Sequence, residues 1–138
     1  MKIDRRLTAA KLLPAVHRLL DLTAPKILDL DRSWDAGRGT PVFTRAGRYT
    51  TRGWTEWTQG FQYGCALLQY DMTGESRFLE IGRRQTIDHM APHVSHVGVH
   101  DHGFNNLSTY GNLRRLMLEG RLPFDQRELE LYELAIKV

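Results

Sequence analysis

Apolar residues recur three or four positions apart in several segments of the chain, which is the spacing of one face of an α-helix. In the first segment, residues 5–22, this spacing predicts one amphipathic helix that faces a core. Pro14 falls inside the segment, so we expect it either to kink the helix or to mark its first turn. The apolar positions are Leu12, Leu13, Val16, Leu19 and Leu20.

The same spacing predicts three further helices, over residues 57–70, 76–89 and 105–119. A tight turn at residues 73–75 joins the first two, and Gly120 stands where a left-handed cap would end the third. The helix over residues 57–70 starts near Thr55 or Glu56, and its inner side is expected to carry Phe61, Cys65, Leu67 and Leu68.

The last segment begins with a helix start signal, because Asp125 is followed three residues later by Glu128, the charge arrangement of a capping box. Apolar positions then continue to Ile136. No glycine or proline exit precedes Val138, so we expect the sequence to be cut off within or just after a helix.

Residues 31–52 interrupt the helical pattern with glycines, Pro41 and scattered arginines. This composition predicts a long irregular connection, with at most a short strand around Val42 and Phe43. Loops of this length are uncommon in small domains and are usually functional or disordered. The aromatic residues that follow the segment favour a functional loop.

The length of 138 residues suits one small domain, and helical hairpins in series predict an all-α fold without an internal domain boundary. Nineteen basic and sixteen acidic residues leave a net charge of +3, too small and dispersed for a nucleic-acid surface. The paired arginines are expected to lie on solvated faces. No unbroken apolar run predicts a signal peptide or membrane span.

Cys65 is the only cysteine, which excludes an internal disulfide and any multi-cysteine zinc site. Its neighbours are small or apolar, so a buried, unreactive thiol is expected. Free thiols suit a reducing compartment, and the predicted localisation is cytoplasmic.

Five of the six histidines cluster within fourteen residues, which raises the hypothesis of a metal site: His89, His93, His96, His100 and His102. His89 and His93 have helical spacing, but Pro92 would break a helix between them. His100 and His102 alternate in an extended segment and would point to opposite sides. Hydrogen-bonding histidines in a polar loop are therefore the preferred interpretation.

Aromatic and polar residues alternate between Trp54 and Tyr63, a composition that suits a carbohydrate site because a flat ring packs against a sugar face. Core packing explains the aromatics equally well. Glu56 and Asp101 add the carboxyl groups that glycoside chemistry uses. For Asp101 the competing interpretation is a simple cap of the helix that begins near Phe104.

Three motifs in this order resemble the amino-terminal third of the unsaturated glucuronyl hydrolases of glycoside hydrolase family 88. The segment Trp57-Thr58-Gln59-Gly60-Phe61 resembles the family's W-T-x-G-F, and residues 70–75 resemble its Y-x-x-T-G-[DE] turn. The segment His100-Asp101-His102-Gly103-Phe104 resembles its H-D-x-G-F, with a histidine at the variable position that is often apolar in relatives.

This resemblance implies an (α/α)6 barrel, of which residues 1–138 would form an incomplete amino-terminal part. It implies removal of a 4,5-unsaturated uronic acid from the non-reducing end of lyase-generated oligosaccharides by hydration of the vinyl-ether double bond, without cofactor or catalytic metal. Carried over by position, Asp101 is the essential aspartate, Trp57 lines the sugar subsite and His100 is a hydrogen-bonding neighbour. The family's second aspartate and its uronate-binding residues would follow Val138, so the isolated chain is expected to be inactive.

Other interpretations stay open. The related family 105 unsaturated rhamnogalacturonyl hydrolases, or another α/α-barrel carbohydrate-active enzyme, would share the fold. A non-enzymatic helical binding module, or a histidine-rich metal binder, is the alternative outside enzymes. The expected partner is an unsaturated uronate-containing oligosaccharide of undetermined parent polysaccharide, with neither nucleic acid nor membrane. Unpartnered leucine-rich faces also predict self-association of the chain.

Overall fold

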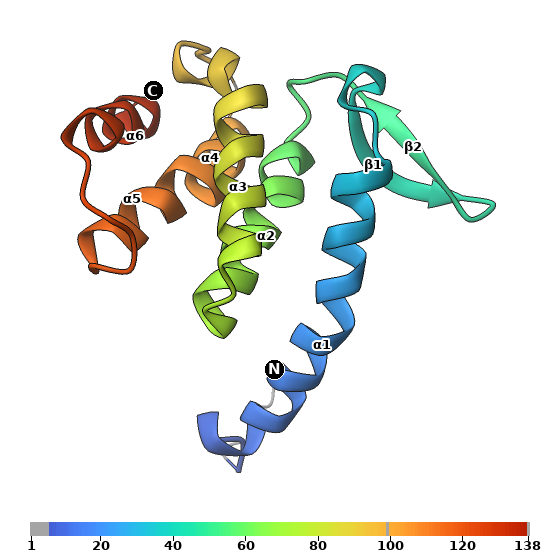
Figure 1. Cartoon of the computed structure of the whole chain (residues 1–138). Coiled ribbons are helices and arrows are strands. Elements are labelled where there is room, and N and C mark those ends of the chain that lie inside the picture. Colours follow the sequence, from blue (N-terminus) through green and yellow to red (C-terminus); the bar gives the residue numbers. More distant parts are fainter. Residues whose placement is uncertain (1–5, 99, 138) are drawn as a thin grey trace. The chain divides into compact units, whose positions relative to one another are not determined.

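The computed structural model describes residues 6–98 and 100–137 of the chain (Figure 1). Helices dominate, as expected for the all-α class, and one small two-stranded sheet is added to them. The residues fall into two compact units, 1–34 and 35–138, and each is described by itself. None of the helices in the described residues has the length and apolar content that crossing a bilayer requires.

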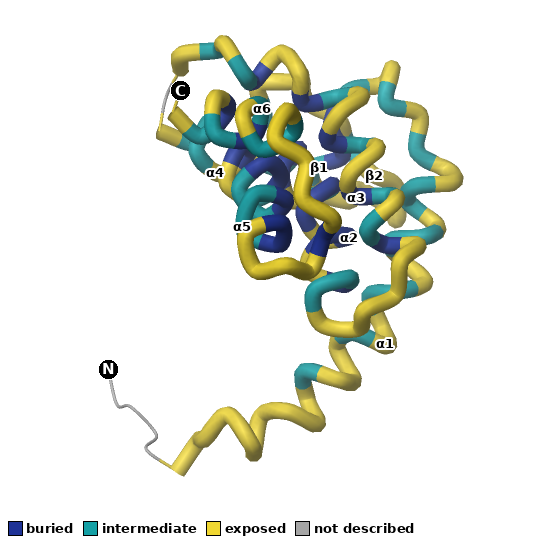
Figure 2. Tube along the Cα trace, turned by 60° about the vertical axis from the view of Figure 1, so that its left-hand side comes forward, coloured by how far each residue is buried: buried dark blue, intermediate teal, exposed yellow. Residues whose placement is uncertain are grey.

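The first unit contains one helix, α1 (Ala9–Ser33), which starts later and extends eleven residues further than the sequence predicts. Thr8 caps it, since its hydroxyl oxygen accepts from the Lys11 N–H at 3.3 Å. Pro14 lies in the second turn, so the expectation of a first-turn proline is wrong. Taken by itself, the helix has no buried residue (Figure 2), so the contact of its leucines with a core stays a prediction.

The second unit opens with a β-hairpin where an irregular connection was expected. After a short 3₁₀ turn (Ala36–Arg38), β1 (Thr40–Arg45) pairs antiparallel with β2 (Arg48–Arg52). The two-residue loop between them, Ala46-Gly47, has φ of 50° and 74°, the left-handed conformation that tight hairpins require. The prediction missed the hairpin because its strands consist largely of threonines and arginines, with little hydrophobic alternation.

Two helices follow as a hairpin, α2 (Thr58–Thr73) and α3 (Ser76–His89). The predicted bounds of α3 are confirmed, and the turn depends on Gly74, whose φ is 73°. The predicted inner side of α2 is partly wrong: Leu67 is buried, but Phe61, Cys65 and Leu68 are exposed. Glycines explain the difference, because Gly60 and Gly64 occupy positions of α2 that touch the backbone of the helix starting at His102.

The next long helical segment starts at His102, three residues earlier than expected. A short 3₁₀ turn (Ala91–Val94) precedes it, and the segment then comprises α4 (His102–Asn106), a π-helical turn (Leu107–Gly111) and α5 (Asn112–Leu118). The predicted stop at Gly120 is confirmed. Its φ is 70°, and the N–H groups of Gly120 and Arg121 donate to Met117 and Leu116 carbonyls at 3.0 and 2.9 Å, a Schellman cap.

The final helix, α6 (Gln126–Lys137), starts at the predicted cap. Asp125 Oδ1 accepts from the N–H groups of Arg127 and Glu128 at 2.9 and 3.0 Å. The Glu128 carboxylate instead accepts from the Tyr132 hydroxyl at 2.8 Å and from Arg83. The capping box is therefore only half formed, because Glu128 links α6 to α3.

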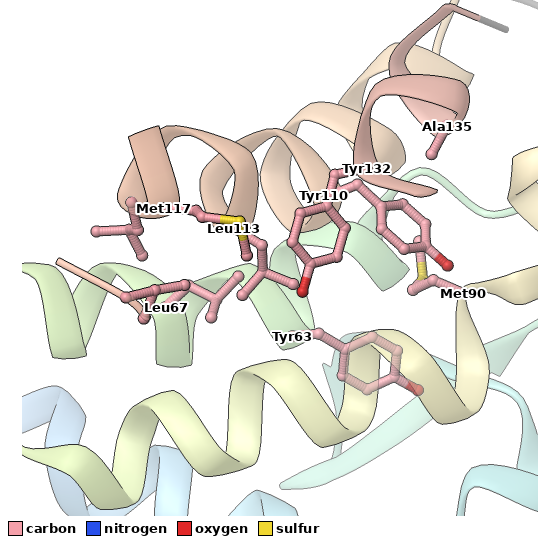
Figure 3. Packing of buried hydrophobic residues seen from close by; sticks show 10 residues of the cluster. Tyr63, Leu67, Met90, Tyr110, Leu113, Met117, Tyr132 and Ala135 are labelled. Atoms are coloured by element: carbon pink, nitrogen blue, oxygen red, sulfur yellow. The ribbon is translucent and has the colours of Figure 1, made fainter. Parts of the chain in front are cut away.

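The hydrophobic core lies among α2, α5 and α6 and the start of the 91–94 turn (Figure 3). Tyr110 and Tyr132 place their rings 6.1 Å apart at its centre. The other buried members are Tyr63, Leu67, Met90, Leu113, Leu116, Met117, Leu122 and Ala135. This core fixes the position of α2 relative to the helix that starts at His102, and both helices carry residues of the candidate site.

The turn motif at residues 70–75 has a structural role in this core. The Tyr70 hydroxyl donates to the Arg121 carbonyl at 2.7 Å. The Asp71 carboxylate, mostly buried, accepts from Arg115 at 2.6 Å and also from Arg121. These bonds tie the end of α2 to the end of α5.

Candidate functional site

Two glycines on α2 bring the first and third sequence motifs together. A Cβ on Gly60 would lie 2.4 Å from Asn105 Cα and 2.8 Å from the carbonyl oxygens of Phe104 and Asn105. A Cβ on Gly64 would lie 2.5 Å from the Ser108 carbonyl oxygen. Only glycine permits this backbone contact, so the helix that carries Trp57 packs directly on the helix that starts beside Asp101.

Asn105 fixes the contact with a hydrogen bond. Its side chain is fully buried, and its Oδ1 accepts from the Gly60 N–H at 2.7 Å. This N–H belongs to the first turn of α2, where the helix itself offers no acceptor. The bond therefore satisfies an end group of α2 and sets its position along α4.

Three aromatic side chains gather where these helices meet, and we call Trp57, Phe61 and Phe104 the aromatic patch. The Trp57 ring lies 5.4 Å from Phe61 and 5.9 Å from Phe104, and the two phenylalanine rings are 5.8 Å apart. Each residue is partly exposed, at 41%, 39% and 46%. Core packing therefore does not account for them, and the patch offers flat apolar surface to a ligand.

Asp101 lies one helical turn from this patch, because its carbonyl oxygen accepts from the Phe104 N–H at 3.0 Å. It stands at the N-cap position, immediately before α4, yet its side chain makes no capping hydrogen bond. The interpretation of Asp101 as a simple cap is therefore wrong for this conformation. Its carboxylate is 41% exposed and lies 3.3 Å from His100 Nε2.

A pocket of about 320 Å³ adjoins this segment. The volume is within the range of small-ligand sites. Both polar and aliphatic side chains line it; the lining residues are Gly98, His100, His102, Gly103, Asn106, Leu107 and Ile136. No atom lies within 4 Å of a Cβ built on Gly103, so the surface beside Asp101 is open at this residue.

Two of the clustered histidines, His93 and His102, belong to one hydrogen-bonded network. His93 is fully buried, with Nε2 2.9 Å from Gln59 Oε1 and Nδ1 3.3 Å from His102 Nδ1. His102 Nε2 lies 3.0 Å from the His93 carbonyl oxygen. Because a carbonyl only accepts, this nitrogen of His102 carries a proton.

Every ring nitrogen of His93 and His102 therefore has a polar neighbour within 3.3 Å. Among the residues described, no group of three or more potential ligands is arranged to hold a metal. Trp54 covers the network, with its ring 5.2 Å from that of His93 and 5.0 Å from that of His96. The variable position of the third motif, His102, thus connects the 91–94 turn to α4.

Burial, with a smaller contribution from positive charge on His102 or His96, lowers the pKa of His93 to about 4, although a hydrogen bond to the Trp54 backbone acts in the opposite direction. The unfolded chain takes up this proton near pH 6.5. Between these values the unfolded state binds more protons, so the free energy of unfolding should fall as the pH decreases from about 6.5 to about 4 and then level off.

Urea unfolding of the wild type and of His93→Gln at several pH values across this window measures the effect. Glutamine does not titrate, so the variant should have a flatter stability profile than the wild type. Parallel profiles would show that His93 is not the group responsible.

Several residues of the site were not identified from the sequence: Gln59, Phe104, Asn105 and Asn106. One signal was present, because Asn106 stands seven residues before Leu113 and so shares the core face of a helix. Asn106 Nδ2 donates to the Ala135 carbonyl at 2.7 Å. Asn105 Nδ2 and Asn106 Oδ1 are buried without a partner among the described residues, as occurs where water or a ligand completes a site.

The structure brings together all three predicted site residues, with Trp57 in the aromatic patch and His100 beside Asp101. Their roles stay predictions. No family model matches the sequence, and neither the search of curated proteins nor that of solved structures returned a match. The resemblance to unsaturated glucuronyl hydrolases therefore rests on the three motifs.

Proposed function

We propose that these residues form part of the sugar site of a glycoside hydrolase that removes 4,5-unsaturated uronic acid from the end of an acidic oligosaccharide. The observation that carries the proposal is the meeting of the aromatic patch with the Asp101–His100 pair across the Gly60–Asn105 contact. Two motifs far apart in the sequence supply, at one place, a surface for a sugar ring and a carboxyl group for proton transfer.

In the proposed reaction the Asp101 carboxyl group acts at the double bond of the unsaturated sugar. A carboxyl group donates a proton to one carbon of the vinyl ether, water adds to the neighbouring carbon, and a proton of that water returns to a carboxylate. The resulting hemiketal opens and releases the rest of the oligosaccharide. His100, at 3.3 Å, would orient the carboxylate.

The proposed role of Trp57 is to bind the apolar face of the sugar. Replacing Trp57 by Ala should weaken binding of an unsaturated glucuronyl disaccharide roughly tenfold, because the largest ring of the patch is lost. Calorimetric titration of the 138-residue chain measures the dissociation constant.

Phe124→Ala is the matched control, since Phe124 is an exposed aromatic residue in the loop before α6. It should bind the disaccharide like the wild type. Equal affinity of Trp57→Ala and wild type, with both variants folded by circular dichroism, would overturn the proposed sugar site.

A further inference from the structure

Positive charge is concentrated on the β1–β2 hairpin. Residues 36–55 contain four arginines and no carboxylate, whereas residues 56–138 contain eight basic and eleven acidic residues. The hairpin is therefore strongly basic beside a helical part with a net negative charge. In the helical part, arginines such as Arg83 and Arg115 form ion pairs with carboxylates.

The three arginines of the two strands share one face. Arg45 and Arg48 are direct cross-strand partners, and side chains of paired residues point to the same side of a sheet. Arg52 lies four residues along β2 from Arg48 and thus on this same face, about 13 Å away. All three residues are exposed. We call Arg45, Arg48 and Arg52 the arginine face.

The strand that carries Arg48 and Arg52 leads along the chain toward the candidate site. The strand β1, whose first two residues are buried, contacts α2, and the loop between β1 and β2 lies away from α2 and α3 (Figure 1). At the other end, Arg52 is two residues before Trp54, whose ring packs on His93 and His96. An extended ligand that leaves the site along β2 would pass Arg52 first and Arg48 later.

We propose that the arginine face binds the acidic sugar chain that extends from the candidate site, and so makes the protein prefer longer polyanionic oligosaccharides. This inference rests on the proposed function, which supplies the uronate-containing ligand. Guanidinium groups bind carboxylate and sulfate by paired N–H donors, and their spacing along β2 suits a polymer with repeated charges. A nucleic acid also carries repeated negative charge, and the test therefore includes single-stranded DNA as a competing ligand.

The test compares a hexasaccharide of the same uronate series with the disaccharide, by calorimetric titration of the chain at low and high salt. In Arg45→Gln/Arg48→Gln, hexasaccharide affinity should fall roughly five- to tenfold, because two exposed charge pairs are lost. Disaccharide affinity should be unchanged. The matched control, Arg127→Gln/Lys137→Gln, removes two exposed charges from α6 and should bind both ligands like the wild type.

The proposal is supported if only the hairpin variant loses the preference for the hexasaccharide and if added salt removes that preference in the wild type. It is overturned if the hairpin variant binds the hexasaccharide like the wild type, or if single-stranded DNA of equal charge binds the arginine face as tightly. Trp57→Ala distinguishes the sugar site from the arginine face, because it should weaken binding of both the disaccharide and the hexasaccharide. Unchanged binding in that variant would count against the sugar site and not against the arginine face.

Discussion

Replacing Asp101 by Asn is expected to lower kcat on an unsaturated glucuronyl disaccharide by about 10² to 10⁴, the usual contribution of general acid–base catalysis. The amide keeps the shape of the side chain but can neither give nor regain a proton. Since the Asp101 side chain makes no capping hydrogen bond and is well exposed, the substitution should leave the stability of the fold unchanged.

Turnover is measured on the gene product that contains these residues, by following the ultraviolet absorbance of the conjugated double bond. Asp88→Asn provides the control, because Asp88 is an exposed carboxylate near the end of α3 and should be dispensable. His100→Gln should lower kcat, but less than Asp101→Asn does. If the Asp101→Asn variant has the kcat of the wild type, Asp101 is not a catalytic acid or base. The residues would then be better explained as a sugar-binding module.

Replacing Gly60 by Ala is expected to destabilise the second unit by about 3 kcal/mol, at the upper end of the usual range for overpacking. The added methyl group would stand 2.4 Å from Asn105 Cα, so backbone and not a flexible side chain must move. Separation of the helices would also stretch the Gly60–Asn105 hydrogen bond. Sugar binding should weaken together with stability.

Gly103→Ala is the matched control, since no atom lies near its added Cβ and its φ is not positive. Alanine is the better helix former by up to about 1 kcal/mol, so this variant should be as stable as the wild type or more stable. Chemical denaturation of both variants gives the comparison. Equal stability of Gly60→Ala and Gly103→Ala would show that the close helix contact is absent in solution.

Much of the helical architecture was predictable because local signals act within a few residues. The left-handed glycines at 74 and 120, the Asp125 cap and the apolar spacing in α3 each identify an element from its own sequence. The inner side of α2 was not predictable in this way. Its exposed Phe61 and its buried Gly60 depend on a helix forty residues later, so hydrophobicity alone assigns them to the wrong sides.

The site was predictable only where its residues belong to local motifs. Trp57, His100 and Asp101 stand in motifs, but the residues that join those motifs, Gln59 and Asn105, are polar residues without a local signature. The histidines illustrate the limit most clearly. Their clustering was visible, whereas the partner of each ring nitrogen depends on how the 91–94 turn folds against α4.

The π-helical turn at Leu107–Gly111 has a consequence for recognising relatives of this chain. A π turn holds one residue more than the α-helical turn it replaces, and such turns often lie close to functional sites. A homologue with a regular α-helix here would be one residue shorter between His102 and Leu113. Its alignment with this chain would therefore need a single-position gap inside a helix, where alignment methods penalise gaps most.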